Sequence, residues 1–139
     1  MRLTGIHHSS IVVTDMERAR RFYRDVLGLK VINDVKFDGF RWLSLSPPAQ
    51  PGVEIVLGVP EQYPDISPAD RDAVSGLVTK GLLPGVIFAT DNCDATFEQL
   101  RAAGAEVMQE PIDQHYGVRD CAFRDPAGNM LRFSQSKAS

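Results

Sequence analysis

Apolar and polar positions along the first part of the chain alternate between two periods. Short runs rich in apolar and β-branched residues, at 6–13 and 29–36, are typical of strands. Between them lies one apolar stripe at helical spacing, made of Ala19, Phe22, Tyr23, Val26 and Leu27. Asp15 precedes the stripe as an N-cap, and Gly28 follows it where a left-handed residue ends a helix. The pattern predicts a strand, a helix and a strand, followed by two more strands at 40–46 and 53–58.

The second half of the chain repeats this order. A strand is predicted at 83–89, and a helix from about Asn92 to Ala103, capped by Asp91 and ended by Gly104. Three more strands are predicted, at 106–109, 118–124 and 130–135. The sequence Asp125-Pro126-Ala127-Gly128-Asn129 is a strong turn signal between the last two.

An internal repeat supports this duplicated order. Asp15 and Asp91 lie 76 residues apart, and so do Gly28 and Gly104. We therefore predict a single α+β domain of two βαβββ modules, with curled mixed sheets and the helices outside. Module one covers about 1–58, a linker with a short helix near 68–80 covers about 59–82, and module two covers about 83–139.

Composition narrows the function classes. The chain has 139 residues, enough for one domain with a sizeable core, and 43% of them are hydrophobic. A formal net charge of −3 argues against nucleic acid as a partner. No apolar run is long enough for a membrane span, and the N-terminus lacks the apolar run of a signal peptide. With only two cysteines and no export signal, we expect a cytoplasmic protein with reduced thiols.

Four motifs in order carry a resemblance to a known family. They are His8-Ser9-Ser10-Ile11-Val12-Val13-Thr14-Asp15, Phe22-Tyr23-Arg24-Asp25-Val26-Leu27-Gly28-Leu29, Tyr116-Gly117-Val118-Arg119 and Phe123-Arg124-Asp125-Pro126-Ala127-Gly128-Asn129. In these motifs and in its internal repeat, the chain resembles the glyoxalase/bleomycin resistance protein/extradiol dioxygenase (vicinal oxygen chelate) superfamily. The resemblance implies a glyoxalase-like fold around a cupped pocket, a small-molecule ligand and a homodimer.

The resemblance also implies a place for a divalent metal. Metal-using members of the superfamily supply a His from the first strand and a Glu from the fourth strand of each module, leaving positions open for substrate. In module one these positions carry His8 and Glu54. In module two they fall on Pro84 and Arg132, which are not metal ligands, so the second half-site is lost. We expect no cofactor, with a divalent metal on His8 and Glu54 as the alternative. Strand alternation would place His7 on the opposite face from His8.

The charge at Arg132 suggests another arrangement. By analogy with the superfamily, Glu54 would face Arg132, and an ion pair would then replace the metal. The alternative is that Arg132 points to solvent or anchors an acidic ligand. Asp120 and Arg124 are expected on the solvent-facing surface of their strand.

These residues lead to three function hypotheses. The first is a metal-independent protein that binds a small molecule, aromatic compounds included, as bleomycin-resistance proteins do. The second is a metal-dependent lyase or dioxygenase with a non-standard site built on His8 and Glu54. The third is an accessory domain without a pocket. The candidate ligand-binding residues are His8, Ser10, Trp42, Glu54, Tyr116, Arg119 and Arg132. Trp42 as ordinary core packing and His8 as a structural residue are the alternatives, and whether the protein is an enzyme stays open.

Overall fold

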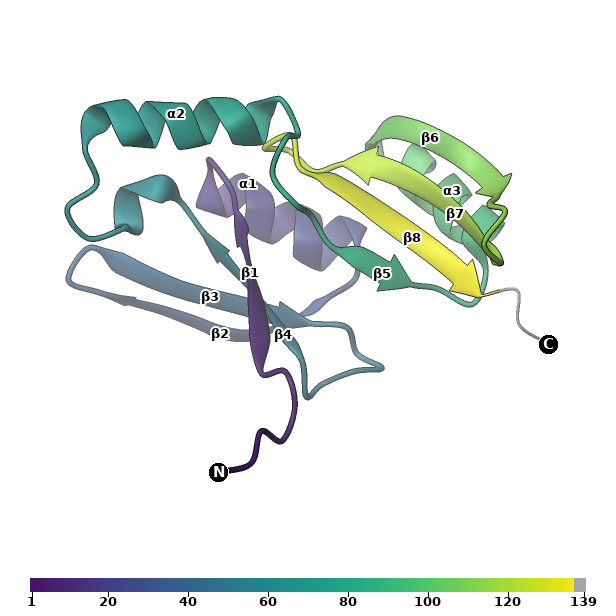
Figure 1. The fold of residues 1–139 in the computed structure, drawn as a ribbon, viewed down its shortest axis with the longest axis horizontal. Coiled ribbons are helices and arrows are strands. Elements are labelled where there is room, and N and C mark those ends of the chain that lie inside the picture. Colours follow the sequence, from purple (N-terminus) through teal and green to yellow (C-terminus); the bar gives the residue numbers. More distant parts are fainter. Residues whose placement is uncertain (137–139) are drawn as a thin grey trace. The chain divides into compact units, whose positions relative to one another are not determined.

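Each half of the chain folds into one open four-stranded mixed sheet (Figure 1). The structure is a computed structural model and describes residues 1–136. The first sheet has the order β1-β4-β3-β2, from β1 (His8–Val12), β2 (Lys30–Phe37), β3 (Phe40–Ser46) and β4 (Glu54–Gly58). The second has the order β5-β8-β7-β6, from β5 (Ile87–Ala89), β6 (Glu106–Asp113), β7 (Val118–Arg124) and β8 (Met130–Ser136). In both, only the first and last strands of the module pair in parallel. The predicted α+β class with two βαβββ modules is confirmed.

The helices lie between the strands as the periodicity predicts. In module one, α1 (Met16–Arg21) continues as a π-helical segment, η1 (Phe22–Val26), and in module two α3 (Cys93–Ala102) takes the same place. A 3-10 turn, η2 (Pro60–Gln62), and α2 (Pro68–Thr79) connect the modules, which confirms the helix predicted near 68–80. The chain divides into two compact units, Met1–Gly76 and a second that begins at Leu77. No helix within residues 1–136 is long and apolar enough to cross a membrane.

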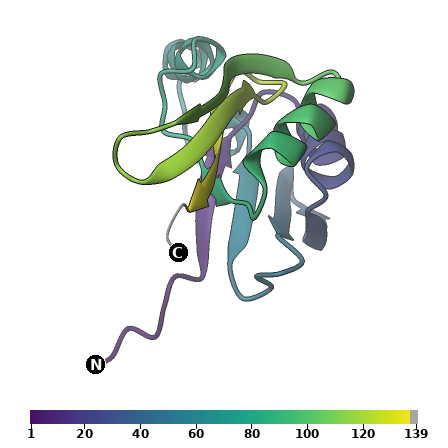
Figure 2. The ribbon, with the colours of Figure 1, turned by 90° about the vertical axis from the view of Figure 1, so that its right-hand side faces the viewer.

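In each unit a helix lies on one side of the sheet (Figure 2), and the buried apolar side chains fill the space between them. Alternate residues of β3 and β4 bury Leu43, Leu45 and Leu57 completely, on the side where Tyr23 is also buried. In module two, α3 packs against the sheet through the rings of Phe97 and Phe123, whose centroids lie 5.4 Å apart. The other face of each sheet carries no helix of its own unit, and its side chains are mostly half-exposed or polar, with Val56 and Ala122 as buried apolar residues among them. We call these the helix-free faces of modules one and two.

The two modules differ by one residue in the first helix. The N-cap of α3 is Asn92, not Asp91 as predicted, because the Asn92 side chain accepts from the Ala95 amide at 3.0 Å. Asp15 caps α1 in the same way, so the two caps lie 77 residues apart, whereas Gly28 and Gly104 lie 76 apart. A π-helical turn holds one residue more than an α-helical path, and η1 therefore accounts for the difference.

Two predicted strand bounds were wrong by four residues, each for a local reason. β6 continues past Pro111 to Asp113, because β6 is at the edge of its sheet, where a missing N–H costs no ladder hydrogen bond. β5 begins only at Ile87. Just before it, Gly85 approaches the neighbouring strand so closely that a Cβ there would lie 2.1 Å from the carbonyl oxygen of Met130.

Candidate functional site

The helix-free face of module one gathers four of the predicted ligand-binding residues. His8 on β1 lies level with Glu54 on β4, and Ser10 lies level with Val56, so all four point to the same face. From β3, Trp42 and the buried Ser44 share this face. The His8 and Trp42 rings meet edge to face, with centroids 5.4 Å apart. Predicted residues His8, Ser10, Trp42 and Glu54 thus form one half-exposed surface with an aromatic ring beside polar groups.

A small polar network lies beneath this surface. The Asn33 side-chain amide donates to the Ser44 hydroxyl at 3.1 Å and to Glu54 Oε1 at 3.4 Å. Sequence reasoning missed Asn33, although its place on the predicted 29–36 strand was the available signal. Its amide holds the Glu54 carboxylate in place on the sheet, leaving the second carboxylate oxygen for other contacts.

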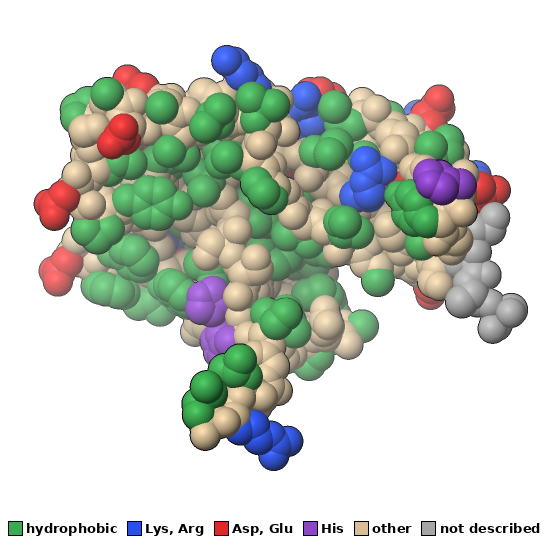
Figure 3. Space-filling model, viewed as in Figure 1, with side chains coloured by type: hydrophobic (Ala, Val, Ile, Leu, Met, Phe, Trp, Pro, Cys, Tyr) green, Lys and Arg blue, Asp and Glu red, His purple; other side chains and the backbone are tan. Residues whose placement is uncertain are grey.

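The neighbouring histidines contradict the strand-alternation argument. His7 Nδ1 lies 3.0 Å from His8 Nδ1, so the two imidazoles meet instead of facing opposite ways. The reason is that β1 begins at His8, and His7 precedes the regular pleat. Figure 3 shows two of the three histidine side chains next to each other on the surface. The polar group at this end of β1 is therefore a histidine pair.

The strand register also revises which module-two residues correspond to His8 and Glu54. Leu45 pairs with Ile55 in module one, as Phe123 pairs with Leu131 in module two, which makes Met130, not Arg132, the equivalent of Glu54. Ile87 pairs with Arg132 in parallel, so Gly85, not Pro84, lies level with Met130. For His8 the equivalent moves from Pro84 to Gly85 because the first helix of module one holds one residue more. For Glu54 it moves by two residues, from Arg132 to Met130, which lies at the 76-residue spacing of the sequence repeat.

The donor set tests the metal centre that the family resemblance implies. Module one supplies an imidazole and a carboxylate, but Gly85 has no side chain and the Met130 thioether is a weak ligand for Zn, Ni, Mn or Fe(II). Within residues 1–136 no group of three or more His, Cys, Asp or Glu side chains is placed to hold a metal ion. The residues of this chain therefore do not fit the four-ligand centre.

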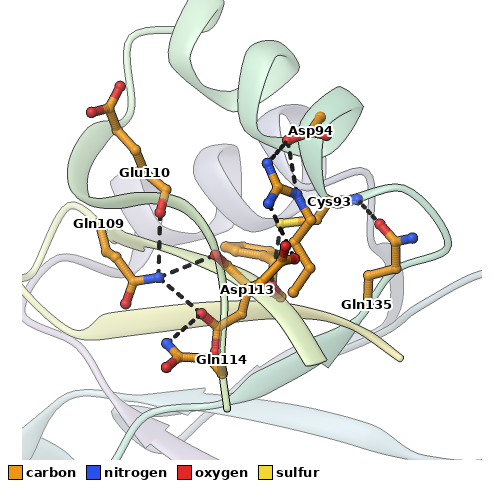
Figure 4. A network of polar contacts seen from close by, with 10 residues as sticks. Cys93, Asp94, Gln109, Glu110, Asp113, Gln114 and Gln135 are labelled. Atoms are coloured by element: carbon orange, nitrogen blue, oxygen red, sulfur yellow. Dashed lines mark hydrogen bonds and ion pairs between the residues drawn. The ribbon is translucent and has the colours of Figure 1, made fainter. Parts of the chain in front are cut away.

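The helix-free face of module two carries a charged pair. Arg132 Nη1 lies 3.4 Å from Asp120 Oδ1, so the arginine has a counter-charge within its own module. Asp120 is completely buried, and the expectation of a solvent-facing carboxylate was wrong. The cover comes from Gln109 and Gln114, whose side-chain amides donate to the same carboxylate oxygen at 2.8 and 3.0 Å (Figure 4). Arg124 is half-buried and donates to the Gly128 carbonyl.

The environment of Asp120 keeps its carboxylate ionised. Burial raises the pKa of Asp120, but the hydrogen bonds from Gln114 and Gln109 and the nearby Arg132 charge outweigh it, and the pKa lies below its usual value. Its second oxygen, Oδ2, is buried and has no hydrogen-bond partner in the described part of the chain. Asp120 is thus a buried anion with one oxygen unused.

Tyr116 and Arg119 are not brought onto this face. Tyr116 is 62% exposed in the turn between β6 and β7, where its ring meets that of His115. Arg119 alternates with Asp120 on β7 and points to the helix side. There it pairs with Asp94 at 2.9 Å and with Asp113 at 3.2 Å. The structure gives Arg119 a role in joining α3 to β7.

The two cysteines offer no nucleophile. Cys93 and Cys121 are free thiols and fully buried. Burial raises the pKa of Cys93, and it raises the pKa of Cys121 to about 12. Since the thiolate is the reactive form, both side chains serve as core residues at neutral pH.

Comparisons with known proteins agree on one family. A family model described as the Glyoxalase/Bleomycin resistance protein/Dioxygenase superfamily matches residues 5–133. The crystal structure of UcmS2 is 32% identical, with a TM-score of 0.89, over 98% of this chain and 100% of that one. TnmS3, an antibiotic binding protein from Streptomyces sp. CB03234, is 26% identical, with a TM-score of 0.77, over 98% of each chain. The uncharacterized protein YurT of Bacillus subtilis is 30% identical over 91% of this chain and 95% of its own length.

Proposed function

The chain belongs to the glyoxalase/bleomycin resistance protein/dioxygenase superfamily, and from this premise we propose that it binds a small aromatic molecule without a metal. The observation that carries the proposal is the helix-free face of module one, where Trp42 stands half-buried beside His8. The similarity to TnmS3, whose name describes antibiotic binding, supports a small-molecule ligand.

The chemistry of this face suits a flat ligand with polar substituents. The indole ring of Trp42 offers a stacking surface, and an offset aromatic pair contributes about 1 kcal/mol beyond the buried area. His8, Ser10 and the free oxygen of Glu54 provide donors and acceptors around it. Packing in the α1 core does not explain the position of Trp42, because β3 directs Leu43 and Leu45 to that core and Trp42 to the opposite face.

Because Trp42 is the only tryptophan in the sequence, its fluorescence reports on this face alone. We expect planar bicyclic and tricyclic aromatics to quench or shift that emission saturably. In calorimetry, Trp42→Leu should lower the affinity for the same compounds by at least about tenfold, because a buried aromatic contact is lost. The matched control is Tyr63→Leu, which removes a half-exposed aromatic ring outside this face. Equal affinities for the wild type and Trp42→Leu would overturn the assignment.

The metal-free part of the proposal has a separate test. Protein purified without chelators should contain far less than one equivalent of Zn, Ni, Mn or Fe by elemental mass spectrometry, because the chain supplies only His8 and Glu54 at the family position. A stoichiometric metal that is lost in His8→Ala would contradict this. That outcome would favour the second candidate, a metal-dependent lyase or dioxygenase, for which the level positions of His8 and Glu54 are the specific observation.

A further inference from the structure

The charged pair on the helix-free face of module two already holds an amide group. Gln109 Nε2 donates to Asp120 Oδ1 at 2.8 Å, while Gln109 Oε1 accepts from Arg132 Nη1 at 2.8 Å. The carboxylate thus binds the N–H side of the amide, and the guanidinium binds the C=O side. The same Gln109 nitrogen also donates to the Asp120 backbone carbonyl, at 3.1 Å. The side chains of this pair are arranged to recognise an adjacent donor and acceptor.

Asp120 and Arg132 also have an acceptor and several donors that Gln109 does not use. Asp120 Oδ2 is buried and accepts no hydrogen bond from any described residue. A buried acceptor without a donor is costly, more so when it is charged, and such groups are rare in folded proteins. Arg132 is 24% exposed, and among the contacts of the described chain only its Nη1 is engaged. A guanidinium carries five N–H donors, so several remain for a second acceptor.

We propose that Asp120 and Arg132 bind a second, external amide-like edge, on a ligand with an N–H donor next to a C=O acceptor, such as a lactam or cyclic imide. Asp120 Oδ2 would accept from the ligand N–H, and the free Arg132 N–H groups would donate to its carbonyl. The assignment uses residues of module two alone and holds independently of the Trp42 proposal.

The charge balance selects a neutral ligand. A cation bound to Asp120 Oδ2 would lie near the Arg132 guanidinium that already neutralises this carboxylate, and the two positive charges would repel each other. An anion would meet the buried carboxylate. An amide N–H carries no charge and matches the donors that Gln109 and Gln114 already present to Oδ1.

In this proposal, Gln114 is the part of the cover over the Asp120 carboxylate that moves aside. This residue follows β6 at the start of the turn before β7 and is half-buried. Its side-chain amide contacts only Oδ1 of Asp120, so it can rotate outward without breaking the Gln109 bridge. In Figure 4 the amide nitrogens of Gln109 and Gln114 are both directed to the same oxygen, which is Oδ1 of Asp120.

A methylated pair of probes tests the proposal. 2-Quinolinone presents a lactam N–H beside its C=O, and N-methyl-2-quinolinone keeps the ring and carbonyl but lacks the donor. We expect 2-quinolinone to bind the full chain and to shift the NMR signals of Asp120, Arg132 and the Gln114 side-chain amide. The N-methyl compound should bind at least about tenfold more weakly, as expected for loss of a hydrogen bond to a charged group.

Variants locate the binding. Asp120→Asn replaces one acceptor oxygen by a donor and should abolish the preference for the N–H probe. If Asp120→Asn does not fold, Arg132→Lys removes the planar donor set at a more exposed position. This variant should weaken the binding of 2-quinolinone by a similar factor. The control is Asp113→Asn, an exposed carboxylate paired with Arg119, which should bind both probes as the wild type does. Equal binding of the two probes, shifts away from these residues, or no binding at about millimolar concentration would each overturn the proposal.

Discussion

Replacing Asp125 by alanine should lower the free energy of unfolding by about 3 kcal/mol, because it strips several buried donors of their acceptor. Asp125 is almost fully buried in the turn between β7 and β8. Its Oδ1 accepts from the backbone amides of Ala127, Gly128 and Asn129 at 2.9–3.0 Å. Its Oδ2 accepts from the Asn129 side-chain amide at 2.9 Å. Alanine offers no acceptor to any of these four donors.

Urea denaturation of the full chain measures the effect, and Asp125→Asn is the matched control. The asparagine keeps one oxygen for the three backbone amides and loses only the contact to Asn129, where two side-chain amides would now face each other. It should therefore cost about 1 kcal/mol. A cost within about 0.5 kcal/mol for the alanine variant would show that water replaces the carboxylate and that the turn does not depend on it.

Replacing Gly128 by alanine should destabilise the protein by about 3 kcal/mol through the backbone alone. Gly128 has φ +112°, a conformation that side-chain-bearing residues rarely adopt. An added Cβ would also lie 2.7 Å from the carbonyl oxygen of Thr79 and 2.8 Å from that of Val78. Both neighbours are backbone atoms at the end of α2, so no side-chain rotation relieves the contact.

Gly104 separates the two causes. It also has a positive φ, +88°, but a Cβ there would meet no atom within 4 Å. Gly104→Ala should cost only about 1 kcal/mol, the strain of the left-handed backbone. Thermal unfolding of both variants, followed by circular dichroism, gives the comparison. Equal losses at the two positions would mean that the α2 end moves away and that the contact with Gly128 is not rigid.

These turn contacts matter for the charged pair on module two. The turn joins β7 and β8 directly, and its geometry sets the register in which Ala122 pairs with Arg132 and Asp120 with Ser134. A slip of one residue would turn Arg132 to the helix side of the sheet. The buried carboxylate of Asp125 therefore contributes to the placement of Arg132 beside Asp120.

Much of the architecture was predictable from local patterns. The apolar periodicity, the Asp15 cap and the Gly28 and Gly104 helix ends predicted both βαβββ modules, and strands 40–46 and 118–124 match β3 and β7 residue for residue. Alternation along the predicted strands puts His8 with Ser10 on one face, but the pairing of β1 and β3 with β4 was needed to bring Trp42 and Glu54 beside them. The periodicity, the helix ends and the alternation depend on residues that are only a few positions apart in the chain, so the sequence pattern can predict them.

Two features that decide the chemistry depend on long-range packing. The π-helical segment η1 adds a residue to module one and moves the module-two equivalent of His8 from Pro84 to Gly85, while the register of β7 and β8 makes Met130 the equivalent of Glu54. Because Arg119 and Asp120 are both charged, the pattern of this strand did not show which of them faces the helix. Only the pairing of β7 with β6 and β8 buried Asp120 beneath Gln109 and Gln114.

The sequence by itself therefore determined the duplicated scaffold, because strand and helix periods are local properties of the chain. Only the tertiary structure decided that His7 meets His8 and that Arg132 pairs with a buried Asp120. The physical reason is that burial and charge pairing are set by residues brought together from different strands, and a one-residue change in register reverses which side chains meet.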